Sequence, residues 1–278
     1  MAVFLSAVVA IGWGISWYYN SSAILYGAIV FALIMNVGSY WFSDKIALFS
    51  ARAHVADENE YRELHRLVEN LSITAGLPKP KVYIIDDPAP NAFATGRDQK
   101  HAVVCATTGL LSMMTKVELE GVVAHELSHV KNRDMLLSTV AVVLAGFVAI
   151  LANMFLRVSF WGGGNRDNEG RGGGLIAIIA IVGAILAPIA AQFIQLAISR
   201  KREFLADASG ALLTRYPEGL ASALQKIGAY SAPMQHASPA TAHLFISCPF
   251  GGRAMQGISK FFMTHPPIED RVKALIEK

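Results

Sequence analysis

The chain has 278 residues, of which 53% are hydrophobic and only 16% are charged, and its mean hydropathy is +0.40. Soluble domains carry about a quarter charged residues, so this composition predicts a membrane protein. The formal net charge of +3 is too small to suggest a nucleic-acid-binding protein. The two cysteines, Cys105 and Cys248, are far apart and form no CxxC pair, which argues against a disulfide framework.

Four apolar runs approach the length of about 20 residues that a helix needs to cross a bilayer. They occupy residues 2–19, 23–42, 135–156 and 175–198. A buried core helix is the alternative for any one of them. Together they predict a mainly α-helical integral membrane protein with two transmembrane hairpins, at 1–43 and 135–198, and a second domain divided between 44–134 and 199–278.

Basic residues near the predicted spans indicate how the chain is oriented in the membrane. They gather on one side of the spans: Lys45, Arg52, Lys131, Arg133, Arg200, Lys201 and Arg202. Cytoplasmic loops carry such an excess of lysine and arginine. The divided second domain is therefore predicted to lie on the cytoplasmic side.

The second domain reads as α+β, with a small sheet. Apolar periodicity predicts helices at 58–75, 116–134, 199–213, 217–227 and from about 267 onward, strands at 81–86 and 102–105, and a third strand at 91–96. Gly76 and Gly228 are expected to end two of these helices. Thr115 and Glu118 have the spacing of a capping box. In the last helix, the residues expected to face inward are Ile268, Val272, Leu275 and Ile276.

The centre of the 116–134 helix reads His125-Glu126-Leu127-Ser128-His129. Histidines four residues apart lie on one face of a helix, so both imidazoles can bind one zinc ion, with Glu126 beside them to take a proton from the metal-bound water. The alternative is a pair of partly buried histidines on an ordinary helix. A chance match in a chain of this length is expected in about one protein in a hundred, so the motif favours zinc.

A catalytic zinc site needs a third protein ligand. The pattern HExxHxxGxxH is excluded, because Asn132 and Met135 stand where its glycine and third histidine belong. The other common class takes a glutamate from a later helix, which Glu203 provides. Asp207, one turn further on, would accept a hydrogen bond from a ligand histidine and fix its tautomer. The alternative for Glu203 is a surface carboxylate paired with a neighbouring arginine.

The predicted topology brings Glu203 and His129 to the same place. Two spans separate them, so both lie on one side of the membrane. His129 lies six residues before the third span and Glu203 five residues after the fourth. At 1.5 Å per helical residue both offsets are roughly 8–9 Å. The motif and the predicted topology therefore both place Glu203 close to His129.

Candidates for contacts with a substrate come from two further regions. Small residues in Asn91-Ala92-Phe93-Ala94-Thr95-Gly96 leave a backbone edge that can add an extended peptide, although spacing alone favours an ordinary hairpin strand. His243, His265 and Arg271 lie near the C-terminus. A histidine or arginine near a zinc-bound carbonyl can stabilise an oxyanion, and a structural role is the alternative for each.

With these motifs and four spans, the chain resembles the HtpX family of bacterial membrane zinc metalloproteases, which are relatives of the CAAX prenyl proteases. The resemblance covers nearly the whole chain. Besides the HExxH motif and Glu203-x-x-x-Asp207, the segments that carry it are 91–96, 199–207, His243-Leu244-Phe245-Ile246 and Thr264-His265-Pro266-Pro267-Ile268-Glu269-Asp270-Arg271. Several independent motifs in the right order make it specific.

The resemblance implies an endopeptidase of the bacterial inner membrane with a zincin-like catalytic domain and a cytoplasmic active site. One Zn2+ ion per chain would be held by His125, His129 and Glu203, with Glu126 as the catalytic residue. The implied role is quality control of membrane proteins under stress. The partners would then be polypeptide substrates and the lipid bilayer, and not nucleic acid.

The resemblance also implies that Asn91, Ala92 and Phe93 belong to a substrate edge, and that His265 and Arg271 contact the substrate or the transition state. Two other functions remain open. One is a protease that processes a single lipidated or precursor substrate. The other is a non-proteolytic membrane scaffold with a structural metal, which the absence of a cysteine near the motif disfavours.

Overall fold

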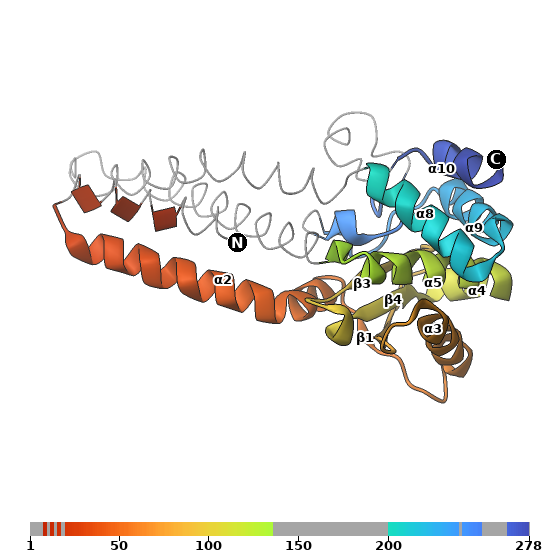
Figure 1. Ribbon diagram of the computed structural model, residues 1–278, viewed down its shortest axis with the longest axis horizontal. Helices are drawn as coiled ribbons and strands as arrows, with labels where there is room; N and C mark the ends of the chain where they lie inside the picture. The colour runs from red at the N-terminus through yellow and green to blue at the C-terminus, as the bar shows by residue number, and fades with distance from the viewer. Residues whose placement is uncertain are drawn as a thin grey trace. The chain divides into compact units, whose positions relative to one another are not determined.

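The computed structural model describes residues 8–9, 12–13, 16–17, 20–135, 200–238, 241–251 and 266–277 (Figure 1). The chain divides into two compact units. One consists of Met1–Phe42 and Val140–Ile194, and the other of Ser43–Thr139 and Gln195–Lys278. Most of the apolar runs predicted at 2–19, 135–156 and 175–198 lies outside the described residues.

The second apolar run forms helix α2, Ser22–Ser50. Just before it the chain turns, with φ +49° at Asn20 and a 2.8 Å hydrogen bond from the Ser16 hydroxyl to the Ser21 carbonyl. Many side chains that α2 exposes are large and apolar, such as Val30 and Ile34. None of the helices within the described ranges combines the length and the apolar character that crossing a membrane requires.

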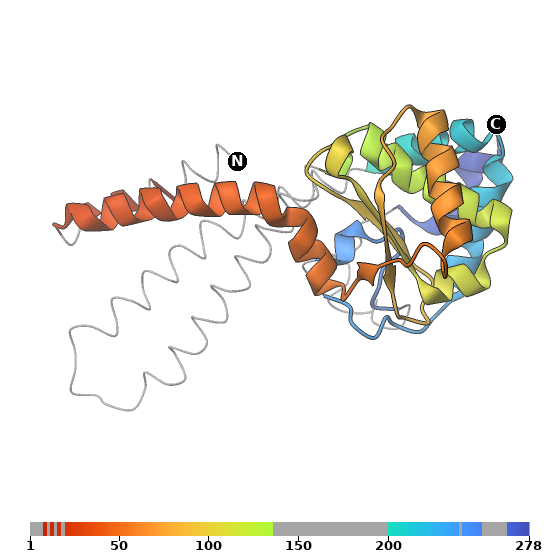
Figure 2. The same ribbon diagram turned by 90° about the horizontal axis from the view of Figure 1, so that it is seen from below.

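A four-stranded sheet lies in the second unit (Figure 2). Its strand order is β1 (His54–Val55), β2 (Lys81–Ile85), β4 (Val103–Thr107) and β3 (Ala92–Thr95). β2 and β4 are parallel, and the two outer strands are antiparallel to their neighbours. The three predicted strands are confirmed. β1 was not predicted, because two residues are too few to show an alternating pattern.

Helix α3, Arg62–Ala75, begins four residues later than predicted. The Asp57 carboxylate accepts hydrogen bonds from the backbone N–H groups of Asn59 and Glu60, and this turn delays the start of the helix. The predicted end is confirmed, because Gly76 has φ +71° and donates its N–H to the Ile73 carbonyl. This left-handed conformation is the one that glycine adopts without steric cost at a helix end.

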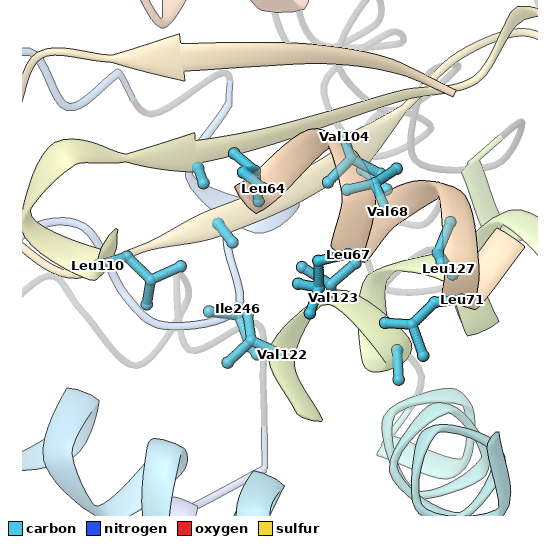
Figure 3. Close-up of a cluster of buried hydrophobic side chains, with 14 of the residues drawn as sticks. Leu64, Leu67, Val68, Leu71, Val104, Leu110, Val122, Val123, Leu127 and Ile246 are labelled. Atoms are coloured by element: carbon cyan, nitrogen blue, oxygen red, sulfur yellow. The ribbon is translucent and has the colours of Figure 1, made fainter. Parts of the chain in front are cut away.

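Helix α5, Lys116–Lys131, is the central element of the second unit. It packs against α3, α8 (Arg200–Thr214), α9 (Pro217–Ala229) and the strands β3 and β4. Figure 3 shows the core where apolar side chains of α3, β4 and α5 meet. Its buried members include Leu64, Leu67, Val68, Val104, Val122, Val123 and Leu127. The helix that carries the HExxH motif is thus fixed by apolar contacts on several sides.

The predicted capping box of α5 is present. The Thr115 side chain accepts from the Glu118 N–H, and the Glu118 carboxylate accepts from the Thr115 N–H at 2.8 Å. Glu118 also accepts from Lys226 at 2.7 Å and from Ser222 at 2.5 Å, so α9 is tied to the start of α5. α5 ends at Lys131, three residues before the predicted end.

Predictions for the last two helices were partly wrong. α9 continues through Gly228 to Ala229. Gly228 lies close to Ile268 of the next helix, because an added Cβ would lie 2.9 Å from the Ile268 Cδ1. In α10, Ile268–Ile276, Leu275 is buried as predicted but Ile276 is 54% exposed. Ile268 and Val272 are partly buried against the core, as predicted, and Arg271 is fully buried. Short helices at Thr108–Met113 (α4), Gln99–His101 (η1) and Ala242–Leu244 (η3) were not predicted.

The hydrogen bonds around Glu118 lead to a prediction about stability and pH. Burial alone would raise the pKa of this carboxyl, but the bonds from Lys226, Ser222 and Thr115 outweigh it and lower the pKa from 4.5 to about 2. A lowered pKa in the folded state stabilises the fold above pH 4.5, and the contribution is lost as the pH falls toward 2. We expect Glu118→Gln to destabilise the full-length protein by about 1–3 kcal/mol near pH 7, and by progressively less in acid.

The measurement is the unfolding midpoint of the purified chain between pH 7 and pH 3, in the presence of a chelator. Glu63→Gln is the matched control, because Glu63 is an exposed acid in the first turn of α3. A Glu118→Gln penalty as small as that of the control, or one that does not shrink in acid, would contradict this account of the α5–α9 contact.

Candidate metal centre

The two histidines of the motif face each other on α5. Their Nε2 atoms are 3.2 Å apart, and the rings meet edge to face with centroids 4.7 Å apart. His125 is buried, and the His129 side chain is 16% exposed. The one-turn spacing predicted from the sequence therefore directs both Nε2 atoms to one point.

Glu203 of α8 reaches the same point. Its carboxylate oxygens lie 3.5 Å from the His129 Nε2 and 3.8 Å from the His125 Nε2. One ligand atom from each of the three residues lies within 4.8 Å of the others. Within the described ranges, this is the one cluster of histidine, cysteine and acidic residues that could hold a metal ion.

A close approach of α8 to α5 makes this convergence possible. At Gly210 of α8, an added Cβ would lie 3.0 Å from the backbone nitrogen of His125 and 3.2 Å from its Cα. A larger residue would therefore push the two helices apart. The glycine lets the helix that carries Glu203 pack directly on the backbone of a ligand histidine.

The far nitrogen of each imidazole is held by a carboxylate. The His125 Nδ1 lies 2.9 Å from Asp207, and the His129 Nδ1 lies 3.1 Å from Asp134. An ionised carboxylate can only accept, so each Nδ1 is assigned the proton and each Nε2 keeps a lone pair for a metal. These residues therefore fit a divalent metal, and Asp207 lies beside a ligand histidine, where the sequence placed it. The alternative of a surface Glu203 paired with a neighbouring arginine is wrong, because Glu203 is buried and Arg202 contacts Asp134.

Arg271 of α10 supports this arrangement from behind. It is fully buried and donates from Nε and Nη2 to the two Asp207 oxygens, at 2.8 and 2.6 Å. Its Nη1 lies 3.7 Å from Glu203. Burial alone would raise the pKa of Asp207, but the hydrogen bonds from Arg271 and His125 hold it at about 2. Asp207 is therefore ionised whenever the protein is folded near neutral pH.

Glu126 is buried between α5 and the sheet, beside the two histidines. Burial raises the pKa of its carboxyl to about 7, opposed by His129 and assisted by the charge of Glu203. A hydrogen bond from the backbone N–H of Ala94 in β3 also lowers it. A cation in the site would lower the pKa further, because a nearby positive charge favours the carboxylate. Without a cation, this group takes up and releases a proton near neutral pH.

The predicted substrate residues on β3 have partners within the chain. The Asn91 amide donates to the Ser247 carbonyl at 3.0 Å and accepts from the Ser247 N–H at 3.3 Å. The Ala92 carbonyl accepts from the Ile246 N–H at 2.9 Å, and Phe93 meets Phe245 edge to face. The first half of the β3 edge is therefore covered by residues 245–247. Ala94, two residues after Ala92, faces the same edge of the strand. There its backbone N–H donates a hydrogen bond to Glu126.

The remaining predicted residues lie in different surroundings. His243 is buried in η3, which contacts β3. Arg271 is buried, and its guanidinium contacts Asp207 and the Ile246 carbonyl, which lies 3.3 Å from its Nη1. His265 lies outside the described residues. Asp134 and its partner Arg202 were missed by the sequence analysis, which assigned Asp134 only to the end of a helix.

Comparison with known proteins gives a consistent set of similarities. A family model described as peptidase family M48 matches residues 58–278. Proteins named Protease HtpX homolog are 49% identical in Caldanaerobacter subterraneus subsp. tengcongensis, over 99% of this chain and 92% of the relative, and 51% identical in Thermoanaerobacter pseudethanolicus, over 96% and 89%. The homologue from Pyrococcus furiosus is 49% identical over 94% of this chain and 89% of its own length. These matches confirm the resemblance found in the motifs.

Among solved structures, Ste24p of S. mikatae has a similar fold, with a TM-score of 0.54 and 19% sequence identity. The match covers 91% of this chain and 58% of Ste24p, so the chain spans little more than half the length of that protein. At this identity the likeness concerns the fold alone.

The contact at Gly210 leads to a prediction about metal binding. We expect Gly210→Val to move α8 away from α5 and to weaken binding of added Zn2+ by about 10-fold or more, as disturbed ligand orientation does. The control is Ala208→Val, because Ala208 is exposed on the same helix. Competition with a chromophoric chelator measures the affinity. Equal affinities of the two variants would show that Glu203 does not depend on this close approach.

Proposed function

Because the chain belongs to peptidase family M48 and is a metal-dependent endopeptidase, we propose that it hydrolyses peptide bonds with one zinc ion held by His125, His129 and Glu203. The observation that carries this proposal is the convergence of the three donors with both Nδ1 atoms held by carboxylates. Two imidazoles and a carboxylate are a common catalytic zinc set, which leaves one position open for water or substrate. A closed structural site would need a fourth protein ligand, and the described residues supply three.

Each residue of the site has a proposed task. When bound, zinc supplies the Lewis acidity that polarises a carbonyl and lets a water molecule lose a proton near neutral pH. The Glu126 carboxylate accepts that proton and then donates it to the nitrogen of the departing strand. Burial of Glu126 favours its protonated form and the cation favours its carboxylate, so the two effects oppose each other at this group. Asp207 and Asp134 hold the imidazoles in place throughout.

The substrate would lie along the outer edge of β3, beside Glu126. β3 ends the strand order of the sheet, and its first half is covered by residues 245–247. We propose that an extended peptide pairs with the second half, from Ala94 to Gly96, next to Glu126. Main-chain hydrogen bonds to a sheet edge select an extended backbone and few side chains, which suits a protease of unfolded segments.

Asn91, Ala92 and Phe93 would then shape this edge by fixing residues 245–247 against it. His243, in η3 beside β3, and His265 remain proposed contacts for the substrate or the transition state. For Arg271 we propose a positioning role instead of contact with the substrate, because its guanidinium is fully buried on Asp207.

We propose that the chain is anchored in the inner (cytoplasmic) membrane by four spans and cleaves damaged membrane proteins on the cytoplasmic side. The apolar runs, the basic residues that flank them and the apolar side chains exposed along α2 support this. The proposed organisation is two hairpins, 1–43 and 135–198, and a catalytic domain formed by 44–134 and 199–278. Processing of a single precursor has no specific support among the described residues.

The test of this proposal is Glu126→Gln. The variant should keep stoichiometric zinc, because the ligands are untouched, and lose about 10²- to 10⁴-fold in the rate of cleavage of an unfolded membrane protein, because the proton acceptor is gone. Glu120→Gln, a change to a half-buried acid on the same helix, is the control and should cleave normally. Metal analysis and a gel-based cleavage assay on purified full-length protein measure both properties. Cleavage by Glu126→Gln at the rate of the control would exclude Glu126 as the base.

A further inference from the structure

The chain makes an unusual turn just after the second histidine. α5 ends at Lys131, and Arg133 follows with φ +60°. The N–H groups of Asn132 and Arg133 still reach back to the carbonyls of Ser128 and Val130, at 2.9 and 3.3 Å. A left-handed conformation costs a residue with a Cβ roughly 1–2 kcal/mol, so the fold must gain something from this turn.

The turn delivers Asp134 to the far side of a ligand histidine. On an unbroken helix, the fifth residue after His129 would lie about 140° away around the axis and would point elsewhere. With the break at Arg133, one Asp134 oxygen instead lies 3.1 Å from the His129 Nδ1. The left-handed conformation of Arg133 therefore allows Asp134 to make a hydrogen bond to His129 of the metal centre.

The other oxygen of Asp134 accepts a hydrogen bond from Arg202 of α8. The Arg202 Nη1 lies 3.2 Å from it, and the side chains of Arg202 and Asp134 are 34% and 12% exposed. Arg202 directly precedes Glu203, so one helix supplies a metal donor and the partner of Asp134. With both oxygens engaged, the carboxylate has little freedom to rotate away from His129.

The same arrangement occurs at His125, where Arg271 holds Asp207 and Asp207 holds the imidazole. Each histidine thus has a carboxylate, and each carboxylate has an arginine. A chain of histidine, carboxylate and arginine at both imidazoles points to a role in the metal centre, because an exposed ion pair alone contributes little to stability.

We propose that Asp134 is a positioning residue that orients His129 for the metal, and that Arg202 acts on the metal centre only through Asp134. The inference rests on the proposed metal site of His125, His129 and Glu203. Removing a carboxylate that orients a ligand histidine typically weakens metal binding by about 10- to 100-fold. The loss expected for Arg202 is smaller, because the hydrogen bond to His129 remains but is less well aligned.

The experiment measures the affinity of purified full-length protein for Zn2+ by chelator competition in four variants. They are Asp134→Asn, Arg202→Gln, the double variant, and Lys201→Gln as the control, since Lys201 is the exposed neighbour of Arg202. We expect a loss of about 10- to 100-fold for Asp134→Asn, less for Arg202→Gln and none for Lys201→Gln. The double variant should bind no more weakly than Asp134→Asn, because Arg202 acts on the metal centre only through the carboxylate that this change removes.

Several results would overturn the inference. An unchanged affinity of Asp134→Asn would show that His129 does not need this carboxylate. A double variant that loses the product of the two single effects would show that Arg202 acts independently. A merely structural role would lower the unfolding midpoint in chelator without changing the zinc affinity, so that midpoint is measured for every variant. If the wild-type protein itself binds no zinc, the proposed metal site fails, and the inference fails with it.

Discussion

Two hydrogen bonds, from the Nδ1 atoms of His125 and His129 to the carboxylates of Asp207 and Asp134, orient the donors of the metal centre. An imidazole without such an acceptor can rotate and exchange tautomers, so its Nε2 lone pair has no fixed direction. The two acceptors come from different elements, one from α8 and one from the turn that follows α5. The site is therefore complete only when these helices pack at a fixed distance.

The buried charges of the centre are compensated from regions remote in the sequence. Carboxylates without partners would be costly at this depth, and breaking a buried pair by removing one partner typically costs about 3–5 kcal/mol. Arg271 is fully buried between Asp207 and Glu203, so α10 belongs to the metal centre although it supplies no metal donor. Its Nη1 also reaches the Ile246 carbonyl, in the segment that covers the first half of β3. The candidate metal centre and the proposed substrate edge thus share one arginine.

The sequence predicted the features that depend on local periodicity or on spacing. The capping box at Thr115 and the helix end at Gly76 follow from residues a few positions apart, and both were found as expected. Asp134 was missed because periodicity continued the helix through it, and a left-handed arginine gives no signal in the sequence. The burial of Arg271 and the partners of Asn91 depend on contacts made across 64 and 156 residues, which no local pattern reveals.

X-ray absorption at the zinc edge of the purified full-length protein tests the central claim most directly, because it reports the atoms bound to the metal. The account predicts two imidazole nitrogens at about 2.0–2.1 Å, together with carboxylate and water oxygen and no sulfur. Replacing Glu203 by alanine should change the oxygen shell and leave both imidazoles. A spectrum with sulfur ligands, with a single imidazole, or with no response to the loss of Glu203 would contradict it.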